Sequence, residues 1–561
     1  MLQQINIKEI TAKLSELWRG DEPAPIRFEK LGYRLKMPYL ASPLYPLVLN
    51  RRNPETVNTS ATSLWPGSAE RGQRLLDGQF EFDNELIQIA EPTWAPAGAS
   101  RHWKKELHSF VWLRDLRAVG DKEASIAAQK TVSFWISKNR YWWPNSWHPL
   151  VTGRRLHHWT SSLDFLSQNA PADFHKEVAT SIYIQANHLA QVLPAGLRGA
   201  RLVTAAKGLV TAGLALPRCP KLWRQGITLI EEALKTDVAS DGFHRERCPK
   251  SQFIVLRDLI DLRNAFAQAE LAEPSFLDEA ITKMAPALRF FIQPDGQITH
   301  LNAVPSVSPE AVQRLLKWAD GGAGPTAQES TELGFQRLSS KNACLFADVG
   351  VPAPSGYDRS SHAGTLSFEY SSGKTKLIVN CGSHVEKALW GKPQRVTAAH
   401  STLVVNETNS SEILETKGLG RQPRLVTAIR SETNDTLMLD TSHDGYEELG
   451  LGIHHRRLRM AQSGALLEGE DRWESSAEVP AVLRFHLHPE VRASLTTDGT
   501  AVLLNPNKGP GWRFQAHGGS LEVTESIHLT GNEHRRTSQI VVHLNPAHQS
   551  RLIVWSFSKQ S

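Results

Sequence analysis

The sequence predicts a multidomain α+β protein in which a helical N-terminal part is followed by an antiparallel β-sandwich. Helical periodicity dominates up to about residue 320. The stretch GGAGPTAQES at residues 321–330 then has the Gly, Pro and polar composition typical of a linker. Beyond it come short runs in which apolar and polar residues alternate. Helices first and strands afterwards favour an α domain joined to a β-sandwich.

The helical part contains apolar stripes at the spacing of an α-helix. One stripe, with spacings of four, three and four residues, consists of Val255, Leu259, Leu262 and Phe266. A second apolar face consists of Leu107, Phe110, Val111 and Leu116. Many such helices joined by short connections fit a ring of helical hairpins.

The C-terminal part follows the period of two expected for strands that are buried on one face. In the run AVLRFHLH the apolar side is predicted to consist of Leu483, Phe485 and Leu487. Asp-Gly pairs at 444–445 and 498–499 fit tight hairpin turns between such runs. We therefore divide the chain into an N-terminal segment at 1–80, a helical domain at 81–320 and a β-sandwich at 331–561.

The composition is that of a folded globular protein. Of the 561 residues, 40% are hydrophobic and 22% are charged, which argues against intrinsic disorder and collagen-like structure. The formal net charge of +5 mildly favours an anionic partner. Basic runs such as HHRRLR at 454–459 have no groove-reading module beside them, so nucleic acid is not the expected partner. Sixteen tryptophans supply flat rings of the kind that carbohydrate-binding surfaces need.

The cysteines and the N-terminal residues indicate the compartment. The four cysteines are widely spaced and form no CxxC pair, so buried reduced thiols are expected rather than disulfides. The first residues lack the basic region and apolar core of a secretory signal, and no apolar run is long enough to cross a membrane. They instead show an amphipathic pattern at Ile5, Ile10, Leu14 and Leu17. A cytoplasmic protein is expected, with the cell envelope or periplasm as the alternative.

Four parts of the chain together resemble sequences of the heparinase II/III family, of the alphaproteobacterial type. They are residues 107–121 with 147–166, residues 198–214, residues 241–263 and residues 361–405. The resemblance spans most of the chain. It implies that residues 81–320 form an incomplete (α/α) toroid, that residues 331–561 form the β-sandwich, and that a substrate cleft lies between them.

The resemblance also implies a reaction. Members of this family that act as enzymes cleave uronate-containing polysaccharides by β-elimination. The uronate carboxylate must be neutralised, a base must remove the C5 proton, and an acid must protonate the departing O4. Arg, His, Asn or a metal suits the first task, and Tyr or His suits the other two.

The chain departs from the family pattern at two catalytic positions. The family's Asn-His pair falls on Ala200 and Arg201, and its Tyr-His pair falls on Ser251 and Gln252. Arg201 could itself neutralise a carboxylate, although a structural ion pair is the competing account. Gln252 is expected to contact the substrate.

Two neighbouring residues are further catalytic candidates in the segment that the resemblance places at the cleft. Arg245 could clamp a uronate carboxylate in bidentate fashion, and His244 could act as a base or hydrogen bond to sugar. The alternative is a surface loop with solvated charges.

A metal site is implied in the β-domain. In the family's HxHxDxLSF-like motif the first His falls on Ser360 and the second on His362. The metal-site Asp falls on Asn380, and a further His is retained as His400. Zn²⁺ is the cofactor that these residues could accept, but Asn is a weaker ligand than Asp. The expected alternative is a pair of hydrogen-bonded core histidines.

The sequence YWWPNSWHPLVTGRRLHHW at 141–159 joins aromatic rings to positive charge. Aromatic faces pack on sugar rings, and arginines hold carboxylates or sulfates. The predicted substrate-binding residues here are Trp147, Arg154 and Arg155. Because Trp residues at helical spacing are more often core, we expect only one or two rings to reach a cleft.

The leading hypothesis is a polysaccharide lyase-like enzyme that cleaves an acidic, uronate-containing polysaccharide. The rival hypothesis is a catalytically altered relative that binds glycan without cutting it. A toroidal glycoside hydrolase would need paired carboxylates across the cleft, for which the cleft-associated segments offer only Asp241 and Glu246.

Overall fold

The computed structural model of the 561-residue chain divides into two compact units. Unit 1 comprises residues 1–236 and 257–281, and unit 2 comprises residues 237–256 and 282–561. The structure describes residues 22–50, 54, 56–58, 62–304, 307–383, 392–414, 418–530, 533–544 and 551–560. The amphipathic pattern predicted from Ile5 to Leu17 lies outside the described residues.

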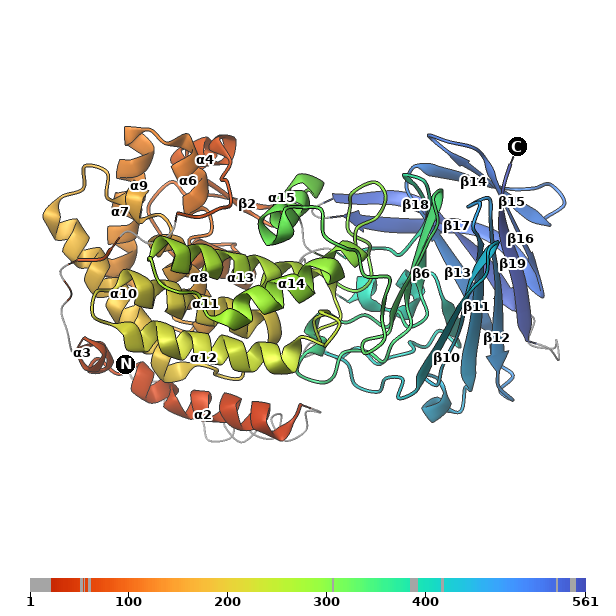
Figure 1. The fold of residues 1–561 in the computed structure, drawn as a ribbon, viewed down its shortest axis with the longest axis horizontal. Coiled ribbons are helices and arrows are strands. Elements are labelled where there is room, and N and C mark those ends of the chain that lie inside the picture. Colours follow the sequence, from red (N-terminus) through yellow and green to blue (C-terminus); the bar gives the residue numbers. More distant parts are fainter. Residues whose placement is uncertain are drawn as a thin grey trace. The chain divides into compact units, whose positions relative to one another are not determined.

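Unit 1 is built almost entirely from helices joined by loops (Figure 1). Its helices are α2 (Ala24–Leu40), α3 (Tyr45–Leu49), α4 (Ala69–Leu76), α5 (Arg101–Ser109), α6 (Leu113–Val119), α7 (Lys122–Lys138), α8 (Pro149–Thr160), α9 (Leu163–Leu166), α10 (Ala172–Val192) and α11 (Gly199–Ala215). A small hairpin joins β1 (Gln79–Phe82) to β2 (Glu85–Gln88). The boundary between the units passes through α12 (Pro220–Asp237), α13 (Pro249–Gln268) and α14 (Ser275–Phe290).

The backbones of helices α8 and α11 approach each other very closely where the two helices cross inside unit 1. A Cβ atom added to Gly208 would lie 2.0 Å from the carbonyl oxygen of Gly153, and one added to Gly153 would lie 2.6 Å from the backbone of Ala205. Only residues without a side chain permit this contact, because real Cβ atoms do not approach a backbone so closely. The small residues of the ARLVTAAKGL segment therefore set the spacing of the two helices.

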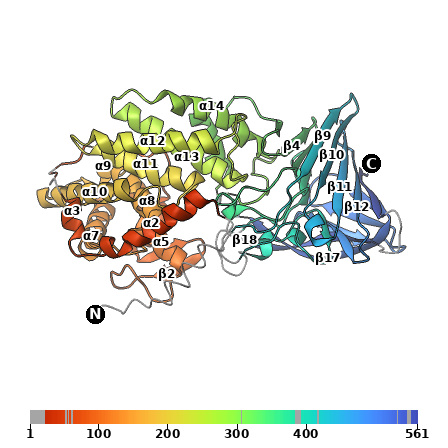
Figure 2. The same cartoon turned by 90° about the horizontal axis from the view of Figure 1, so that it is seen from below.

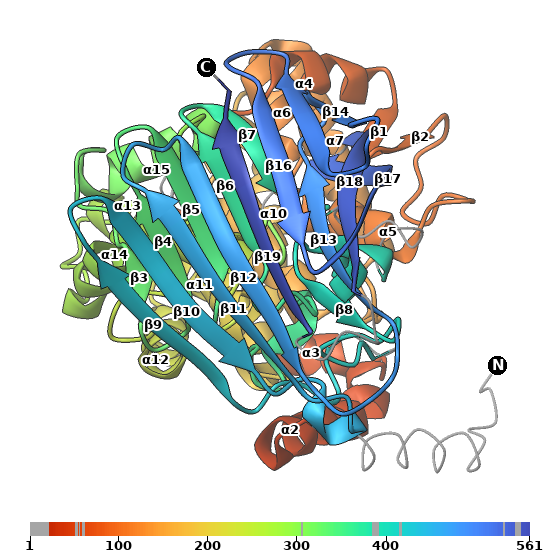
Figure 3. The same ribbon diagram turned by 90° about the vertical axis from the view of Figure 1, so that its right-hand side faces the viewer.

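Unit 2 contains α15 (Pro309–Asp320) and two antiparallel sheets. The eight-stranded sheet, which faces the viewer in Figure 3, has the order β14 (Val491–Leu495), β15 (Ala501–Pro506), β16 (Trp512–His517), β19 (Leu552–Lys559), β12 (Leu466–Glu474), β11 (Ile453–Ala461), β10 (Thr436–His443), β9 (Val426–Glu432). The second sheet has the order β17 (Gly519–Thr530), β18 (Glu533–Leu544), β13 (Ala481–Leu487), β7 (Thr375–Val379), β6 (Phe368–Ser372), β5 (Ala343–Asp348), β4 (Phe335–Ser339), β3 (Glu329–Ser330), with β8 (Leu403–Val405) also paired to β13. Among the described residues, short 3₁₀ turns lie in the loops at Asp358–Ser360, Pro393–Arg395, Thr397–Ala399 and Glu447–Leu449.

The core of unit 2 lies between these two sheets. It contains residues from both, among them Leu483 and Phe485 of β13 and Trp555 of β19. The predicted apolar side of β13 is confirmed, since Leu483, Phe485 and Leu487 are all fully buried. The change from helices to strands also falls where the sequence predicts it, between α15 and β3.

One predicted helical face is wrong. The stripe through Leu107, Phe110 and Leu116 is not one helix, because α5 ends at Ser109 and Phe110 adopts a left-handed conformation with φ of 58°. The chain then restarts as α6 at Leu113. The four cysteines are free thiols, and three of them are buried. Among the described residues, no helix is long and apolar enough to cross a membrane.

Candidate functional site

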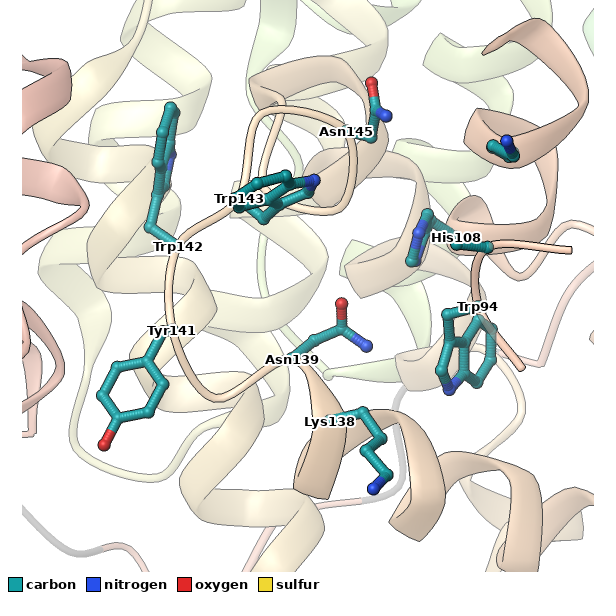
Figure 4. Close-up of a pocket in the computed structure, with 10 residues that line it drawn as sticks. Trp94, His108, Lys138, Asn139, Tyr141, Trp142, Trp143 and Asn145 are labelled. Carbon is teal, nitrogen blue, oxygen red and sulfur yellow. The ribbon is translucent and has the colours of Figure 1, made fainter. Parts of the chain in front are cut away.

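A pocket of about 300 Å³ opens on unit 1 where α5 and the end of α7 meet the loop that leads into α8. Its lining is aromatic and basic (Figure 4). The lining residues are Trp94, Ala95, Lys104, His108, Lys138, Asn139, Tyr141, Trp142, Trp143 and Asn145. Two lysines and no carboxylate face this space, so it favours an anionic occupant.

Aromatic rings form two sides of the pocket. In Figure 4, Trp142 and Trp143 lie on one side and His108 and Trp94 on the other. The Trp94 ring stacks on the His108 ring with centroids 5.5 Å apart and an angle of 22° between the planes. The Nε1–H of Trp94 is buried and has no partner among the described residues, which leaves a donor for a bound molecule.

The rings on the outer side are strongly exposed. Trp143 keeps 66% of its surface accessible and Tyr141 keeps 53%, whereas Trp142 is buried. An exposed indole that is not needed for the core is a platform on which the C–H face of a sugar can pack. The amide groups of Asn139 and Asn145 add polar groups at the same opening.

The two lysines have no carboxylate partner among the described residues. Lys138 stands at the last position of α7, with its Nζ 5.8 Å from the centre of the Phe134 ring. Lys104 projects from α5 and is half-buried. Because no anion of the described chain neutralises them, both charges remain available to a ligand.

His108 is a neutral hydrogen-bonding group of the pocket. Burial, assisted by the charge of Arg155, lowers the pKa of His108 to about 3. Its Nδ1 accepts a hydrogen bond from Trp135 Nε1 at 3.1 Å, so the ring proton resides on Nε2. The ring can therefore donate one hydrogen bond but cannot act as an effective base near neutral pH.

Arg155, a predicted substrate-binding residue, lies behind the pocket and is fully buried. Its Nη1 donates to the carbonyl oxygens of His108 and Ser146 at 2.9 and 2.8 Å, and its Nε donates to Gln185 at 2.7 Å. The guanidinium also stacks on Trp135 at 3.9 Å from the ring centre. Arg155 thus links the backbone at His108, in α5, to the backbone at Ser146, in the loop before α8, and both segments contribute residues to the pocket lining.

The other two predicted substrate-binding residues of this region also make internal contacts. Trp147 is buried, and its Nε1 donates to the carbonyl oxygen of Asn139 at 3.0 Å, which holds the end of α7 in place. Arg154 forms a bidentate pair with Glu106, at 2.5 and 2.6 Å. Neither side chain lines the pocket.

The catalytic candidates fall in different units. Arg201 is the third residue of α11 in unit 1 and is half-buried. His244 and Arg245 belong to unit 2, where Arg245 is exposed and His244 is buried. Burial lowers the pKa of His244 to about 4, although the Asp237 carboxylate opposes this effect.

Gln252 holds the loop that precedes it. Its side chain accepts a hydrogen bond from the His244 backbone N–H at 2.9 Å and donates to the carbonyl oxygens of Gly242 and Met284 at 2.9 and 3.0 Å. The neighbouring Ser251 hydroxyl donates to the Glu246 carboxylate. The two residues at the family's Tyr-His positions are therefore fully engaged within unit 2.

The predicted metal ligands are close together, but their donor set does not fit a three-ligand zinc site. The Nδ1–H of His400 donates to the Val396 carbonyl oxygen at 2.8 Å, so its Nε2 is free to accept from His362 Nδ1 at 3.1 Å. Asn380 accepts from the Ser401 N–H and donates to the His300 carbonyl oxygen. In the part of the chain that the structure describes, no group of three His, Cys, Asp or Glu side chains could hold a metal ion.

Burial keeps both rings of this pair neutral. It lowers the pKa of His400 to about 4, and burial together with the facing His400 ring lowers that of His362 well below its ordinary value. The adjacent Glu369 carboxylate accepts from Gln293, Thr299 and the Asn380 N–H. These donors satisfy the Glu369 carboxylate, whereas the buried Nδ1 of His300, 3.8 Å from it, has no hydrogen-bond partner among the described residues.

Sequence reasoning missed part of the pocket. Tyr141, Trp142 and Trp143 belong to the aromatic segment that the sequence singles out, but Trp94, Lys104, His108 and Lys138 were not predicted. The available signal was that Lys138 and Asn139 lie just before the aromatic run, separated from it by Arg140. Trp94 comes from an irregular segment whose position depends on tertiary packing.

Comparisons with known proteins agree with the domain order. Residues 81–319 match the family model described as Heparinase II/III N-terminus, and residues 323–556 match the model described as Heparinase II/III-like, C-terminal. A curated relative, FtsZ-localized protein C of Caulobacter vibrioides, is 29% identical over 94% of this chain and 93% of its own length.

Solved structures of polysaccharide lyases share the fold at low sequence identity. A heparinase III structure superposes with a TM-score of 0.71 at 17% identity, over 93% of this chain and 89% of that chain. A heparan sulfate lyase HepC mutant from Pedobacter heparinus gives 0.64 at 16% identity, over 93% and 88%. A chondroitin AC lyase from Streptomyces coelicolor A3 gives 0.52 at 13% identity, over 96% and 82%. The predicted fold class, an incomplete (α/α) toroid followed by an antiparallel β-sandwich, is confirmed.

Proposed function

The chain belongs to the heparinase II/III family, and from that premise we propose that it binds an acidic saccharide in the pocket of unit 1 without cleaving it. The observation that carries this proposal is the composition of the pocket, which joins exposed aromatic rings to two lysines without carboxylate partners among the described residues. Rings suit the apolar faces of sugars, and ammonium groups suit uronate carboxylates or sulfates.

Binding without elimination is the better-supported function. A lyase needs a base whose pKa lies near the working pH and an acid beside it. His244 is buried with a pKa of about 4, and Ser251 and Gln252 are bonded within unit 2. Elimination, with either Arg201 or Arg245 neutralising the uronate carboxylate, is the competing hypothesis.

The first experiment measures binding of a uronate-containing polysaccharide, such as heparan sulfate, to wild-type protein and to the double variant Lys104→Ala/Lys138→Ala. Each lost charge-assisted contact should weaken binding by about tenfold or more. Added salt should weaken wild-type binding, and a carboxyl-reduced, desulfated glycan should bind poorly to every variant.

Lys130→Ala is the matched control, because Lys130 is an exposed lysine on the same helix as Lys138 but does not line the pocket. It should bind like wild type. Equal binding of the polysaccharide by the double-lysine variant and by wild type would show that the saccharide does not bind in this pocket. The absorbance of unsaturated uronate appearing during incubation would support the lyase hypothesis instead.

A second proposal concerns location. The curated relative, whose name says that it localises with FtsZ, aligns with nearly the whole of this chain. We infer that this protein localises with FtsZ in its own cell. A fluorescent fusion should coincide with labelled FtsZ, and a uniform distribution in cells with an intact FtsZ structure would contradict the inference.

A further inference from the structure

Arg114, in the first turn of α6, has a guanidinium group that forms no ion pair with a carboxylate of the described residues. Its Nε–H is buried and has no hydrogen-bond partner in that part of the chain. The carboxylate of the next residue, Asp115, instead accepts from Arg71 at 3.0 and 3.2 Å and from the Ser68 N–H at 2.8 Å. A buried donor without a partner calls for an explanation, and a bound ion is one.

The surroundings of Arg114 are positively charged. Burial lowers the pKa of the Arg114 guanidinium, and the adjacent Asp115 carboxylate only partly opposes this effect. The charges of Arg71, Arg154 and Arg257 lower the pKa further. The carboxylates of the protein therefore do not compensate the positive charge that gathers at this point in unit 1.

Contacts between α6 and α8 place Arg114 beside His158. Arg117, one turn further along α6, donates to the carbonyl oxygen of Ser161 at 2.8 Å. Arg114 lies three residues before Arg117, and His158 lies three residues before Ser161, so the two side chains belong to corresponding turns of the two helices. Burial lowers the pKa of His158 well below its ordinary value, and the charges of Arg154 and Arg114 add to this effect. His158 is thus a neutral hydrogen-bonding group next to the arginines.

Arg154 and Arg257 contribute N–H groups that have no acceptor among the described residues. Arg154, four residues before His158 and on the same side of α8, donates from Nη1 and Nη2 to Glu106, which leaves its Nε–H. Arg257 of α13 donates from Nε and Nη2 to Asp258 at 3.4 and 3.2 Å, which leaves its Nη1. Their side chains are 25% and 31% exposed, so a small anion can reach them from solvent.

The helices that carry these groups pack together. Figure 2 shows α8, α11 and α13 side by side, and Lys207 of α11 binds Asp258 of α13 at 2.8 Å. Asp258 also accepts from the Thr204 hydroxyl. Because Asp258 is shared among these donors, it compensates the charge of Arg257 only in part.

We propose that Arg114, Arg154 and Arg257 bind a phosphate group, either as inorganic phosphate or as part of a phosphate monoester. The Arg114 guanidinium supplies a fork of N–H donors that matches two phosphate oxygens, and Arg154 and Arg257 donate to the others. His158 adds a neutral hydrogen bond. None of these four residues lines the aromatic pocket, so the site does not depend on the proposed saccharide binding.

The number and the directions of the donors favour phosphate over a carboxylate. A carboxylate has two oxygens in one plane and a single charge. A phosphate group has three or more acceptor oxygens that point in different directions and close to two charges near neutral pH. Donors that come from three different helices suit the tetrahedral group, and its charge compensates more of the surplus around Arg114.

The experiment is calorimetric titration of the full chain with sodium phosphate at constant ionic strength. Wild-type protein should bind one phosphate per chain, and Arg114→Gln should bind it about tenfold more weakly or less. Arg114→Lys should show an intermediate loss, because it keeps the charge without the fork. Arg257→Gln, at a more exposed side chain, should also lose about tenfold. Glucose 1-phosphate that binds more tightly than inorganic phosphate would identify a monoester as the source of the group, and weaker binding would identify the free ion.

The melting temperature separates a ligand site from a structural arginine. In phosphate-free buffer, Arg114→Gln should melt at or above the wild-type temperature, because it removes a buried charge that its neighbours repel. Phosphate should raise the melting temperature of wild type but not that of the variant. Arg117→Gln is the matched control on the same helix. It should melt at a lower temperature, since the carbonyl oxygens of Ser161 and Ser63 lose their donor, yet keep the full response to phosphate.

Wild-type protein that binds neither inorganic phosphate nor glucose 1-phosphate would overturn the proposal, as would Arg114→Gln protein that binds them as wild type does. Tighter binding of acetate or sulfate than of phosphate would overturn the assignment to a phosphate group. A marked fall in the melting temperature of Arg114→Gln without phosphate would assign this arginine to the stability of α6 instead. The saccharide-pocket variant Lys104→Ala/Lys138→Ala should still bind phosphate, and Arg114→Gln should still bind the uronate-containing polysaccharide, which separates the two proposals.

Discussion

The guanidinium of Arg155 is surrounded by neutral groups rather than by a carboxylate. It donates to two backbone carbonyl oxygens and to the Gln185 amide, and it stacks on Trp135. Burial lowers the pKa of Arg155 well below its ordinary range. Such a group persists in the interior because it satisfies acceptors that would otherwise be unpaired.

Replacing Arg155 with Met should therefore destabilise unit 1 strongly. The change leaves the carbonyl oxygens of His108 and Ser146 without donors, at a cost of about 1–3 kcal/mol each in the free energy of unfolding. Chemical denaturation measures this loss, and Arg140→Met, at an exposed arginine, is the control. A stable Arg155→Met protein that lost only saccharide affinity would instead support a direct contact between Arg155 and the ligand.

Asn380 gives a second prediction at this scale. Asn380→Asp removes the donor to the His300 carbonyl oxygen and places a carboxylate near the buried Glu369, so the melting temperature should fall in metal-free buffer. If His362 and His400 can open to bind Zn²⁺, the ion should restore the variant's stability more than that of wild type. A lack of any response to Zn²⁺, measured by calorimetric titration of both proteins, would favour the hydrogen-bonded histidine pair.

The sequence located the aromatic and basic segment of the site but not the orientation of its side chains. Arg154, Arg155 and Trp147 lie in or beside α8, which is buried on most sides because its Gly153 packs directly on α11. With no broad solvent-exposed face, the helix directs its charged residues inward to Glu106 and to backbone acceptors. Neighbouring residues in the sequence cannot reveal that burial.

At the level of elements, the crossing of α8 and α11 depends on the absence of two side chains. Gly208→Ala should force the helices apart and lower the free energy of unfolding by about 1–3 kcal/mol, as overpacking does. Gly32→Ala is the matched control, since it lies in a helix with open space around its Cβ position. It should be neutral or stabilising by up to about 1 kcal/mol. Similar melting curves for the two variants would contradict this account of the crossing.

Elements were predictable where periodicity was long and uninterrupted. The stripe from Val255 to Phe266 corresponds to α13, and the alternating run around Phe485 corresponds to β13. The break at Phe110 was not predictable, because an aromatic residue with positive φ has no composition signal of the kind that Gly or Pro provides. Its side chain is fully buried among the rings of Trp112, Trp135 and Trp159, so tertiary packing overrides local preference.

For the whole molecule, the order of helices and strands sufficed to predict the architecture, whereas the function of the site depends on particular side chains. The resemblance aligns Ala200, Ser251 and Gln252 with catalytic positions of the family, and the helices α11 and α13 that contain them are formed. A fold is maintained by its buried surface, so it persists when a few polar residues change.

Many histidines are buried in the neutral form, which predicts acid sensitivity. The pKa is lowered by burial to about 3 at His108, His157, His188, His300 and His486. In the unfolded chain these rings take up a proton near pH 6.5, whereas in the folded chain they do not do so until about pH 3. The unfolded state therefore binds more protons between these limits, and stability falls as pH falls.

The melting temperature should thus change little from pH 7.5 to about pH 6.5 and then fall towards pH 5, with each such histidine contributing about 1.4 kcal/mol for every pH unit below 6.5. His188→Gln should melt with a shallower pH dependence, because it removes one of these rings. His543→Gln, at an exposed histidine paired with Glu522, is the control and should keep the wild-type slope. A melting temperature that does not change with pH would contradict the burial of neutral rings.

The position of β19 in its sheet has a consequence for how the protein is made. This strand, Leu552–Lys559, pairs with β12 on one side and with β16 on the other, so it joins the two halves of the eight-stranded sheet. While the chain is being synthesised, the backbone N–H and C=O groups at the facing edges of β12 and β16 stay unpaired until residues 552–559 have left the ribosome. A nascent chain that stalls before this strand would expose the edges of both β12 and β16, which makes it a target for chaperones and for edge-to-edge aggregation.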